Sequence, residues 1–333
     1  MCVRPALLMG LGLILGCPSA PDEVPAAPLS FVAVTFNTGT TLGLGHDAPP
    51  DDGYGLQEAA ISDTWYGDGL AWVDVVEDTR AFFASTPADV VGFQEIFYSG
   101  ECAQIPPEAH PGFVCDGWQP GDRTVAQVIL PEGWQVACHL QKPDKCLAVR
   151  RAFGVIAGCT GDLCLDGLAG AEVDTCGSGS RVGRAVVEMV AGGSITVVNV
   201  HGSSGLGLDD KDCRLAQLQQ VFEDLGDGSG EPGANGSRNL VLGDFNTDPG
   251  RLTGSDPSAA YLADQVQTSA FQFHTAVGPD VIPTYGGLAN IDHVLSDAFI
   301  GGCWTAGVSA GHPDVSTTVY FDHKPTVCAL TAP

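Results

Sequence analysis

The sequence predicts a core of two β-sheets packed face to face, with helices on the outside. Short runs rich in Val, Ile and Phe recur along the chain with turn residues between them, which is typical of strands. Only three stretches have helical periodicity, and no segment recurs at an interval of about 20–50 residues. Many strands with few helices favour sheet-on-sheet packing.

Eight apolar runs are predicted to be strands. Several of them lack alternating polar residues, which predicts that these strands are buried on both faces. The eight runs are Phe31–Phe36, Asp89–Phe93, Val125–Leu130, Val149–Ile156, Val182–Val190, Ile195–Val200, Asn239–Leu242 and Ile291–Leu295.

Helices are predicted at three places. Residues 69–84 have apolar residues at helical spacing behind a possible cap at Asp68, and residues 209–225 have them behind Asp209 or Asp210. A third helix is predicted to start at Asp256-Pro257. Between these elements lie Gly-, Pro- and Cys-rich segments that we expect to be loops, at 38–68, 97–122, 157–181 and 226–237.

The first 28 residues are predicted to precede the folded domain. Residues 1–16 have Arg4 followed by an apolar run, as in an export signal. Ile14-Leu15-Gly16-Cys17 resembles a bacterial lipobox, which would make Cys17 a lipidation site, and the proline-containing segment 17–28 an extended tether. A signal peptide cut a few residues later is the alternative. We therefore expect an exported protein, a cell-envelope lipoprotein or a secreted one, with a single domain at 29–333.

The cysteine content also indicates export. Without Cys2 and Cys17, ten of the twelve cysteines remain, an even number that predicts up to five disulfides. A structural zinc site is disfavoured because no CxxC pairs with a second CxxC or an HxxxH. Spacing does not determine connectivity, but it favours the pairs Cys102/Cys115, Cys138/Cys146, Cys159/Cys164 and Cys303/Cys328.

The chain is strongly acidic, with 14 basic and 40 acidic residues and a formal charge of −26. An acidic surface is typical of extracellular or salt-tolerant proteins, and it opposes the unaided approach of polyanions. A phosphate-bearing substrate would therefore need a local source of positive charge, and a bound divalent metal is one.

Polar residues stand beside predicted core strands in a series of short motifs. Each motif alone has an ordinary explanation, such as a turn or a strand-end carboxylate. Burying unpartnered polar groups costs about 2–7 kcal/mol each, so their repetition favours one shared polar site at the strand ends. The motifs are Thr35-Phe36-Asn37, Gly92-Phe93-Gln94-Glu95, Arg184-Ala185-Val186-Val187, Asn199-Val200-His201, Gly243-Asp244-Phe245-Asn246, Asn290-Ile291-Asp292-His293 and Phe321-Asp322-His323-Lys324-Pro325.

In this order the motifs resemble those of the endonuclease/exonuclease/phosphatase superfamily, typified by pancreatic-type deoxyribonuclease. The resemblance runs from Phe31 to Cys328 and implies an α/β fold, a four-layer sandwich of two mixed β-sheets with helices on the outer sides. Catalytic groups would lie on loops at one edge of it. Phe321 departs from the family, which has a serine there, so we expect unusual hydrogen bonding around Asp322.

The resemblance implies a divalent metal cofactor, Mg²⁺ or Mn²⁺, with Ca²⁺ as a further candidate. Glu95 resembles the main metal-binding carboxylate, helped by Asn37 and Asp322, and Asp244 is a candidate ligand of a second metal. Oxygen donors of this kind suit a hard divalent cation.

The resemblance also implies a phosphoric ester hydrolase in which water attacks phosphorus in line, without a covalent intermediate. Asp244 and Asn246 would orient the water and hold the phosphate. Asp292 would fix the imidazole of His323, which handles protons.

Two further residues are assigned to the substrate phosphate by the resemblance. His201 would donate to a phosphate oxygen or assist the leaving group, and Arg184 would contact the phosphate.

The substrate class stays open at this point. A nuclease acting on DNA or RNA is favoured by Arg184 and His201, although the chain has few lysines for phosphate contacts. A sphingomyelinase-like lipid phosphodiesterase would suit an anchor on Cys17, and a phosphatase acting on small molecules is a further alternative. A non-catalytic scaffold is disfavoured because every expected polar position is filled. We expect a monomer.

Overall fold

The structure is a computed structural model that describes residues 29–45 and 52–333. The predicted export signal, the candidate lipidation site Cys17 and the tether up to residue 28 lie outside the described residues. Among the helices of the described part, none is long and apolar enough to cross a membrane.

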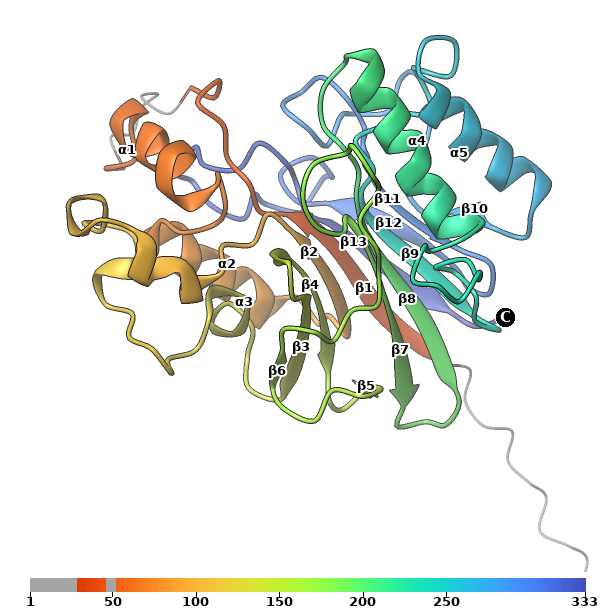
Figure 1. Cartoon of the computed structure of the whole chain (residues 1–333), viewed down its shortest axis with the longest axis horizontal. Helices are drawn as coiled ribbons and strands as arrows, with labels where there is room; N and C mark the ends of the chain where they lie inside the picture. Colours follow the sequence, from red (N-terminus) through yellow and green to blue (C-terminus); the bar gives the residue numbers. More distant parts are fainter. Residues whose placement is uncertain (1–28, 46–51) are drawn as a thin grey trace, which may run out of the picture.

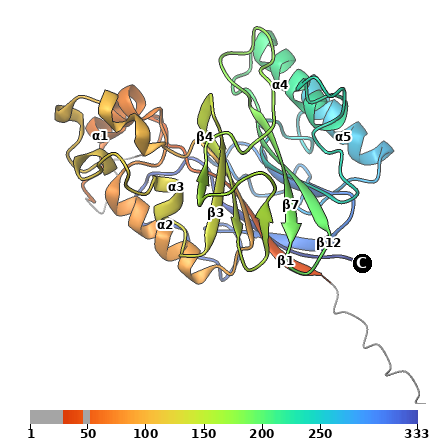
Figure 2. The same ribbon diagram turned by 60° about the horizontal axis from the view of Figure 1, so that its bottom comes forward.

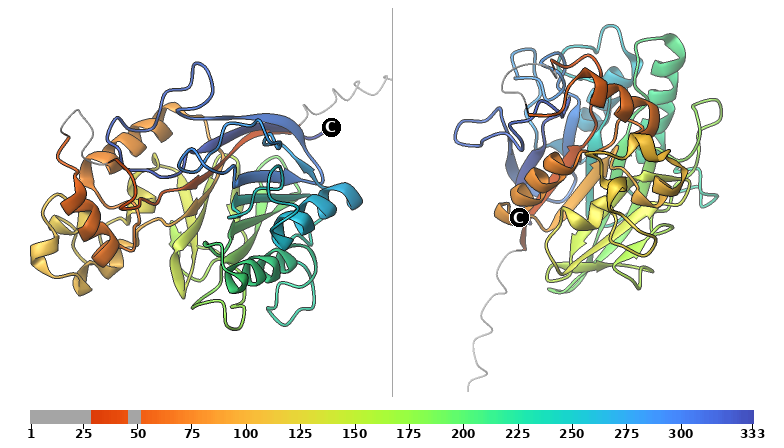
Figure 3. Two further views of the ribbon diagram at one scale, coloured as in Figure 1. Left: turned by 90° about the horizontal axis from the view of Figure 1, so that it is seen from above. Right: turned by 90° about the vertical axis from the view of Figure 1, so that its left-hand side faces the viewer.

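Two mixed β-sheets pack face to face and are covered by helices on both outer sides, as predicted (Figures 1 and 2). Helices α2 (Val73–Ser85) and α3 (Val125–Val128) cover one sheet. Helices α4 (Leu208–Phe222) and α5 (Pro257–Thr268) cover the other. The view from above in Figure 3 shows the two groups of helices separated by the sheets.

The first sheet has seven strands in the order β12-β13-β1-β2-β4-β3-β6. In chain order these strands are β1 (Ser30–Asn37), β2 (Val90–Gln94), β3 (Trp134–His139), β4 (Lys142–Arg150), β6 (Leu163–Cys164), β12 (Ile300–Thr305) and β13 (Thr326–Thr331). The second sheet has six strands in the order β10-β11-β9-β8-β7-β5. They are β5 (Gly154–Ile156), β7 (Val182–Met189), β8 (Ser194–His201), β9 (Asn239–Asp244), β10 (Gln272–Phe273) and β11 (Asp292–Ser296).

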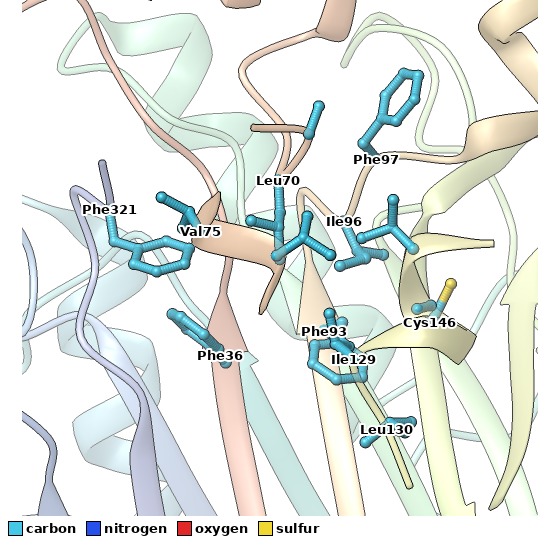
Figure 4. Packing of buried hydrophobic residues seen from close by; sticks show 14 of the residues in the cluster. Phe36, Leu70, Val75, Phe93, Ile96, Phe97, Ile129, Leu130, Cys146 and Phe321 are labelled. Atoms are coloured by element: carbon cyan, nitrogen blue, oxygen red, sulfur yellow. The ribbon is translucent and has the colours of Figure 1, made fainter. Parts of the chain in front are cut away.

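Three apolar clusters hold these layers together. Phe31 and Ala33 of β1 pack between the sheets against residues such as Leu240 of β9, while Val34 and Phe36 point outward under α2. This alternation follows from the two-residue period of a strand. Figure 4 shows the outer cluster around Phe36. The third cluster lies between the second sheet and the helices α4 and α5.

Two predicted strands are wrong in part or in full. Val125–Leu130 forms α3 and the turn after it, because Thr124 and Gln127 make a capping box at the helix start. A short buried apolar run fits a helix as well as a strand. Val149–Ile156 spans the end of β4 and all of β5, with a turn between them, and so passes from one sheet to the other.

The remaining differences from prediction concern boundaries and loops. The helix predicted at 69–84 starts only at Val73, and Asp68 has a left-handed φ of 58° instead of capping it. The segment predicted as a loop at 38–68 contains α1 (Leu56–Ile61) and a π-helix at Ser62–Tyr66. Strands β3, β6, β10, β12 and β13 and most of β4 were not predicted. The helix start at Asp256-Pro257 is confirmed, with Asp256 capping α5.

All four favoured disulfides are present, and the last two of the ten cysteines form a fifth. The fifth bond joins Cys176, in the segment 157–181, to Cys213 of α4, across a separation of 37 residues. The other four are Cys102–Cys115, Cys138–Cys146, Cys159–Cys164 and Cys303–Cys328. One predicted loop segment, 157–181, is thereby tied to the rest of the chain, and Cys102–Cys115 cross-links the segment 97–122 internally.

Candidate functional site

The polar residues at the strand ends lie on the inner faces of the two sheets. Ala33 of β1 and Leu242 of β9 pack between the sheets. Because side chains alternate along a strand, Asn37 and Asp244 continue those inner faces at the end of each strand. The site is therefore a polar continuation of the inter-sheet core.

Strand register brings residues of the second sheet side by side. Asp244 is paired with His201 of the parallel strand β8 and with Asp292 of the antiparallel strand β11. Asn37 reaches across from the first sheet, and its Nδ2 donates to Asp244 Oδ2 at 3.1 Å. The two sheets thus meet at the side chain of Asp244.

His323 lies on the segment before β13 and is surrounded by carboxylates. Its Nδ1 is 2.9 Å from Asp292 Oδ2, and its Nε2 is 3.6 Å from Asp244 Oδ2 and 4.0 Å from Asp322 Oδ1. Burial alone would lower the pKa of His323, but Asp292 and Asp244 raise it well above its usual 6.5. His323 is therefore an imidazolium at neutral pH. We call His323 and these three carboxylates the carboxylate side of the site.

Asp244 is held by the residue two positions later. Its Oδ1 accepts from the backbone N–H of Asn246 at 2.7 Å and its Oδ2 from Asn246 Nδ2 at 2.9 Å. Asn246 has a left-handed φ of 49°, a conformation that non-glycine residues adopt mostly where the surroundings impose it. Burial raises the pKa of Asp244 to about 7 although His323 lowers it, so this carboxylate can accept a proton near neutrality.

Glu95 follows β2 and also has a left-handed φ, of 55°. Its Oε1 is 3.4 Å from Nε2 of His201. Its Oε2 lies where a side chain at Gly39 would be, because a Cβ built there would be 1.9 Å from it. Burial, and next the charge of Asp322, raise the pKa of Glu95 to about 8. The fold thus holds Glu95 in a strained backbone and leaves its carboxylate short of positive partners.

His201 differs from His323 in its surroundings. Its Nε2 is 3.8 Å from Asp244 Oδ2, and its buried Nδ1 has no hydrogen-bond partner among the described residues. Burial, followed by the charges of Lys145 and Arg181, keeps the pKa of His201 well below 6.5. His201 is therefore neutral at neutral pH.

The residues predicted as metal ligands fit a divalent cation. Glu95, Asp244 and Asp322 all have raised pKa values because burial and neighbouring carboxylates disfavour their charged forms, a condition that a cation relieves. Oδ1 of Asp322 is buried without a hydrogen-bond partner. With Asn37 these groups offer the oxygen donors that Mg²⁺ prefers.

A second set of atoms is close enough to hold a metal. Ligand atoms of Asp244, Asp292 and His323 all lie within 4.8 Å of one another. A protonated imidazole has no lone pair for a metal, however. Nδ1 of His323 is hydrogen-bonded to Asp292, and Nε2 lies 3.6 Å from Asp244 Oδ2. We therefore interpret this set as a cluster held together by the charge of His323, in which only Asp292 is hydrogen-bonded to the imidazole.

Arg184 is not part of this cluster. Its Nη2 forms an ion pair with Asp227 Oδ2 at 2.9 Å, and its Nη1 donates to the Pro232 carbonyl. The reason is strand register, because β7 runs antiparallel to β8 and Arg184 lies opposite Val198, three residues before His201. We expected Arg184 to contact the substrate phosphate. The structure instead places its guanidinium on Asp227 and Pro232, outside the cluster.

Three basic residues near His201 were missed by the sequence reasoning. The carbonyl of Arg181 accepts from the N–H of His201 at 2.8 Å, and Arg181, Lys142 and Lys145 all act on the pKa of His201. Pairing the predicted strands 182–190 and 195–200 as a hairpin would have found Arg181, since it precedes the strand that ends opposite His201. We call Lys142, Lys145, Arg181 and His201 the basic side of the site.

Phe321, which stands where the sequence resemblance leads us to expect a serine, makes apolar contacts. Its ring is 4.9 Å from that of Phe36, centroid to centroid. The side chain of Asp322 correspondingly has an Oδ1 without a hydrogen-bond partner. On the other flank, the ring of Tyr285 lies 4.8 Å from that of His323. Apolar and aromatic contacts therefore hold the segment that carries Asp322 and His323.

No protein-family model and no curated protein matches the sequence. Solved structures do match. ANGEL2, a 2′,3′-cyclic phosphatase, in complex with adenosine-2′,3′-vanadate, is similar with a TM-score of 0.51 and 12% identity, over 92% of this chain and 96% of that chain. The fold is therefore the α/β sandwich that the sequence resemblance implied.

Two further solved structures cover similar shares of the chain. Truncated TDP2 of Caenorhabditis elegans has a TM-score of 0.48 and 12% identity, over 91% of this chain and 98% of that chain. An endonuclease/exonuclease/phosphatase from Beutenbergia cavernae DSM 12333 has a TM-score of 0.45 and 15% identity, over 91% and 72%.

Proposed function

We propose that the protein is a divalent-metal-dependent hydrolase of phosphodiesters, with nucleic acid or its fragments as substrate. The observation that carries this proposal is the position of His323, held as an imidazolium between Asp292 and Asp244 beside the carboxylate of Glu95. In-line attack of water on phosphorus requires a fixed positive charge, a carboxylate that can take a proton, and oxygen donors for a metal ion. The imidazolium of His323 supplies the positive charge here.

Each group has a distinct role in the proposed reaction. Asp244, with Asn246 fixing its orientation, positions the attacking water and accepts its proton. His323 donates Nε2–H to a phosphate oxygen and balances the charge that develops on it, while Asp292 keeps the ring in place. His201, which is neutral, is a second hydrogen-bond donor to the phosphate or the leaving oxygen.

A metal held by Glu95, Asn37 and Asp322 would neutralise phosphate charge and polarise the ester.

Arg181 takes the role that the sequence suggested for Arg184, namely contact with the substrate phosphate. It is in no ion pair among the described residues, its Nε is buried without a partner, and its charge acts on His201. A free guanidinium at this point is suited to a phosphate oxygen.

Nucleic acid is favoured as the substrate class. ANGEL2, which has a similar fold, is named a 2′,3′-cyclic phosphatase and holds an adenosine derivative. A lipid phosphodiesterase is the second candidate, because Leu206 and Leu208 after His201, and Leu288 near Tyr285, are exposed apolar side chains around the site. Vesicles of sphingomyelin should be tested beside DNA and RNA.

We also propose that the protein works outside the cytoplasm. Five disulfides in one chain support this, since disulfides persist in oxidising compartments. If Cys17 is lipidated, Cys17→Ser should release the protein from the membrane fraction of its native host. Finding the wild-type protein wholly in the medium would contradict the lipoprotein assignment.

The central experiment tests metal dependence and Glu95 together. Hydrolysis of plasmid DNA and RNA should stop in excess EDTA and return with Mg²⁺ or Mn²⁺. Glu95→Gln should abolish most activity with little change in melting temperature, whereas Glu188→Gln, on an exposed position of β7, is a matched control that should change neither. Undiminished hydrolysis in EDTA would refute the proposal, and unfolding of Glu95→Gln would indicate a structural role for this carboxylate.

A further inference from the structure

Arg214 of α4 is a buried charge that the proposed reaction does not use. Only 1% of its surface is exposed, and its Nη2 forms an ion pair with Asp256 Oδ2 at 2.8 Å. Because Asp256 caps α5, the pair joins the two helices that cover the second sheet. A buried ion pair adds little stability over apolar residues of the same volume, since both charges lose their contact with water. The other hydrogen bonds of Arg214 indicate a further role.

The remaining N–H groups of Arg214 hold the loop at 202–205, directly after β8. Nη1 donates to the carbonyls of Ser203 at 2.6 Å and Gly205 at 3.0 Å. Gln217, one turn later on α4, holds the same loop, because its Oε1 accepts from the Ser203 N–H at 2.7 Å. A planar guanidinium can bind two carbonyls and a carboxylate at once, which a lysine ammonium does less well. The loop is thereby fixed to α4.

This loop is in close contact with the residues that end β9. The Gly202 carbonyl accepts from Asn246 Nδ2 at 3.0 Å, and the Gly202 N–H donates to the Asp244 carbonyl at 2.8 Å. A Cβ built on Gly202 would lie 2.4 Å from the Phe245 carbonyl oxygen, so a larger residue would collide with it. One side of Asn246 is therefore held by the loop that Arg214 fixes.

The ion pair also holds the other side of Asn246. Thr247 is the next residue, and its Oγ1 lies 3.0 Å from Ser258 Oγ. Ser258 Oγ in turn accepts from Arg214 Nε at 3.3 Å and donates to Asp256 Oδ1 at 2.6 Å. Asn246 has the left-handed φ of 49°, a conformation that the surrounding structure must impose. Contacts on both sides of this strained residue thus lead to the Arg214–Asp256 pair.

We propose that Arg214 is a positioning residue: it keeps Asn246 in the conformation that orients the carboxylate of Asp244. This inference rests on the proposed function only for the role of Asp244, which positions the attacking water. If Asn246 moved, Asp244 would lose the two hydrogen bonds of 2.7 and 2.9 Å that fix its oxygens. Variants of Arg214 should therefore lower kcat and leave KM nearly unchanged.

The experiment is a double-mutant cycle between Arg214 and Asn246, in the disulfide-bonded protein with Mg²⁺ and bis(p-nitrophenyl) phosphate. Arg214→Lys keeps a positive charge opposite Asp256 but cannot also hold both loop carbonyls. It should lower kcat about tenfold to a hundredfold, the loss expected when a catalytic group is misplaced by about 1 Å. The double variant should be hardly worse than Asn246→Ala alone, because residues that act as one unit are not additive.

The matched control is Arg150→Lys, which changes the ion pair with Asp89 at the end of β4 away from the site. It should leave kcat unchanged, alone and combined with Asn246→Ala. A second variant, Arg214→Met with Asp256→Asn, removes both buried charges and keeps an oxygen to cap α5, so it should fold. It too should lose kcat, and it replaces Arg214→Lys in the cycle if that variant does not fold.

A readout without activity separates this inference from the proposed function. The side-chain amide signal of Asn246 in NMR spectra, assigned by its loss in Asn246→Ala, should shift in Arg214→Lys and stay in place in Arg150→Lys. An unshifted signal, multiplicative losses in the cycle, or wild-type kcat in the folded Met/Asn variant would overturn the inference and leave the hydrolase intact. If the signal shifts but no phosphodiester is hydrolysed with Mg²⁺, the proposed function fails and the hold of Arg214 on Asn246 stands.

Discussion

His323 and His201 both lie within 4 Å of the same oxygen of Asp244, at 3.6 and 3.8 Å, yet their charges at neutral pH differ. His323 also bonds to Asp292 and is protonated. His201 has basic neighbours and is neutral. The ring is the same, so the difference comes from the charges that the fold places around each one.

This comparison divides the site into two functional parts. The carboxylate side contains the imidazolium of His323 and carboxylates that can take up a proton, and in the proposed reaction these groups serve the chemical step. The basic side offers neutral and positive donors, which in the same proposal serve substrate binding. Variants on the carboxylate side should therefore lower mainly kcat, and variants on the basic side should raise mainly KM.

The largest expected effect is on the carboxylate side. His323→Ala should lower kcat by about 10²–10⁴, the range for a positioned acid or base, and Asp292→Ala should be comparable or milder. The double variant should be hardly worse than His323→Ala alone, because residues that act as one unit are not additive. Multiplicative losses in steady-state kinetics would show that Asp292 and His323 act independently.

Arg181 and Arg184 offer a matched pair on and off the basic side. Arg181→Ala should reduce kcat/KM by about ten- to a hundredfold, the loss expected for a charged hydrogen bond to phosphate, mainly through KM. Arg184→Ala should stay within about threefold, since it removes the partly exposed ion pair with Asp227 and the hydrogen bond to the Pro232 carbonyl, neither of which involves the site. A larger loss of kcat/KM in Arg184→Ala than in Arg181→Ala would instead support Arg184 as the residue that contacts the substrate phosphate.

Replacing Cys176 and Cys213 together by Ser tests whether the basic side depends on its anchor. The chain-entropy account predicts a loss of about 3–4 kcal/mol in the free energy of unfolding for a loop of this length. We expect a lower melting temperature and a higher KM, with a nearly unchanged kcat. A fall in kcat at constant KM would contradict the division of the site.

The smallest expected effect concerns pH and the carboxylate side in the metal-free protein. The raised pKa values of Glu95, about 8, and Asp244, about 7, mean that the folded state binds more protons than the unfolded state up to about pH 8. His323 adds in the same direction, so stability should fall as pH rises from about 6.5 to 8. Below about pH 6.5, His201 acts in the opposite direction: folding lowers its pKa, so its contribution to stability increases as pH rises.

The measurement is the melting temperature in EDTA and in Mg²⁺ across this range. The metal-free protein should melt a few degrees lower at pH 8 than at pH 6.5, and stabilisation by Mg²⁺ should grow with pH as it replaces protons. A pH-independent stabilisation would argue against binding at these carboxylates. Glu95→Gln should flatten the metal-free profile.

Much of the site was predictable because two features can be read from the sequence: where an apolar run ends, and which residues of the run alternate toward the core. Asn37, His201 and Asp244 each follow an apolar run with the inward-facing register, and the structure places them together. Arg184 was misplaced because a motif gives residue type but no register. The register of β7 against β8 puts Arg181 next to His201 instead.

The unpredicted parts of the fold have a different cause. Strand β12 contains the pair Gly301-Gly302, and a glycine in a strand weakens the apolar pattern. Strand β4 begins with Lys142-Pro143-Asp144-Lys145, which contains a proline and three charged residues and so lacks the apolar pattern of a strand. In α3 the capping box favours a helix over a strand. Apolar periodicity over so few residues does not distinguish the two.

The bond between Cys303 and Cys328 has a consequence for the resistance of the protein to proteolysis. The exposed turn around Gly311 separates β12 from the segment that carries Asp322 and His323. In a chain without this bond, one cut at Gly311 would leave the last strand held by non-covalent contacts alone. Here the two fragments stay linked next to paired strands, so a nicked molecule keeps its complete set of site residues.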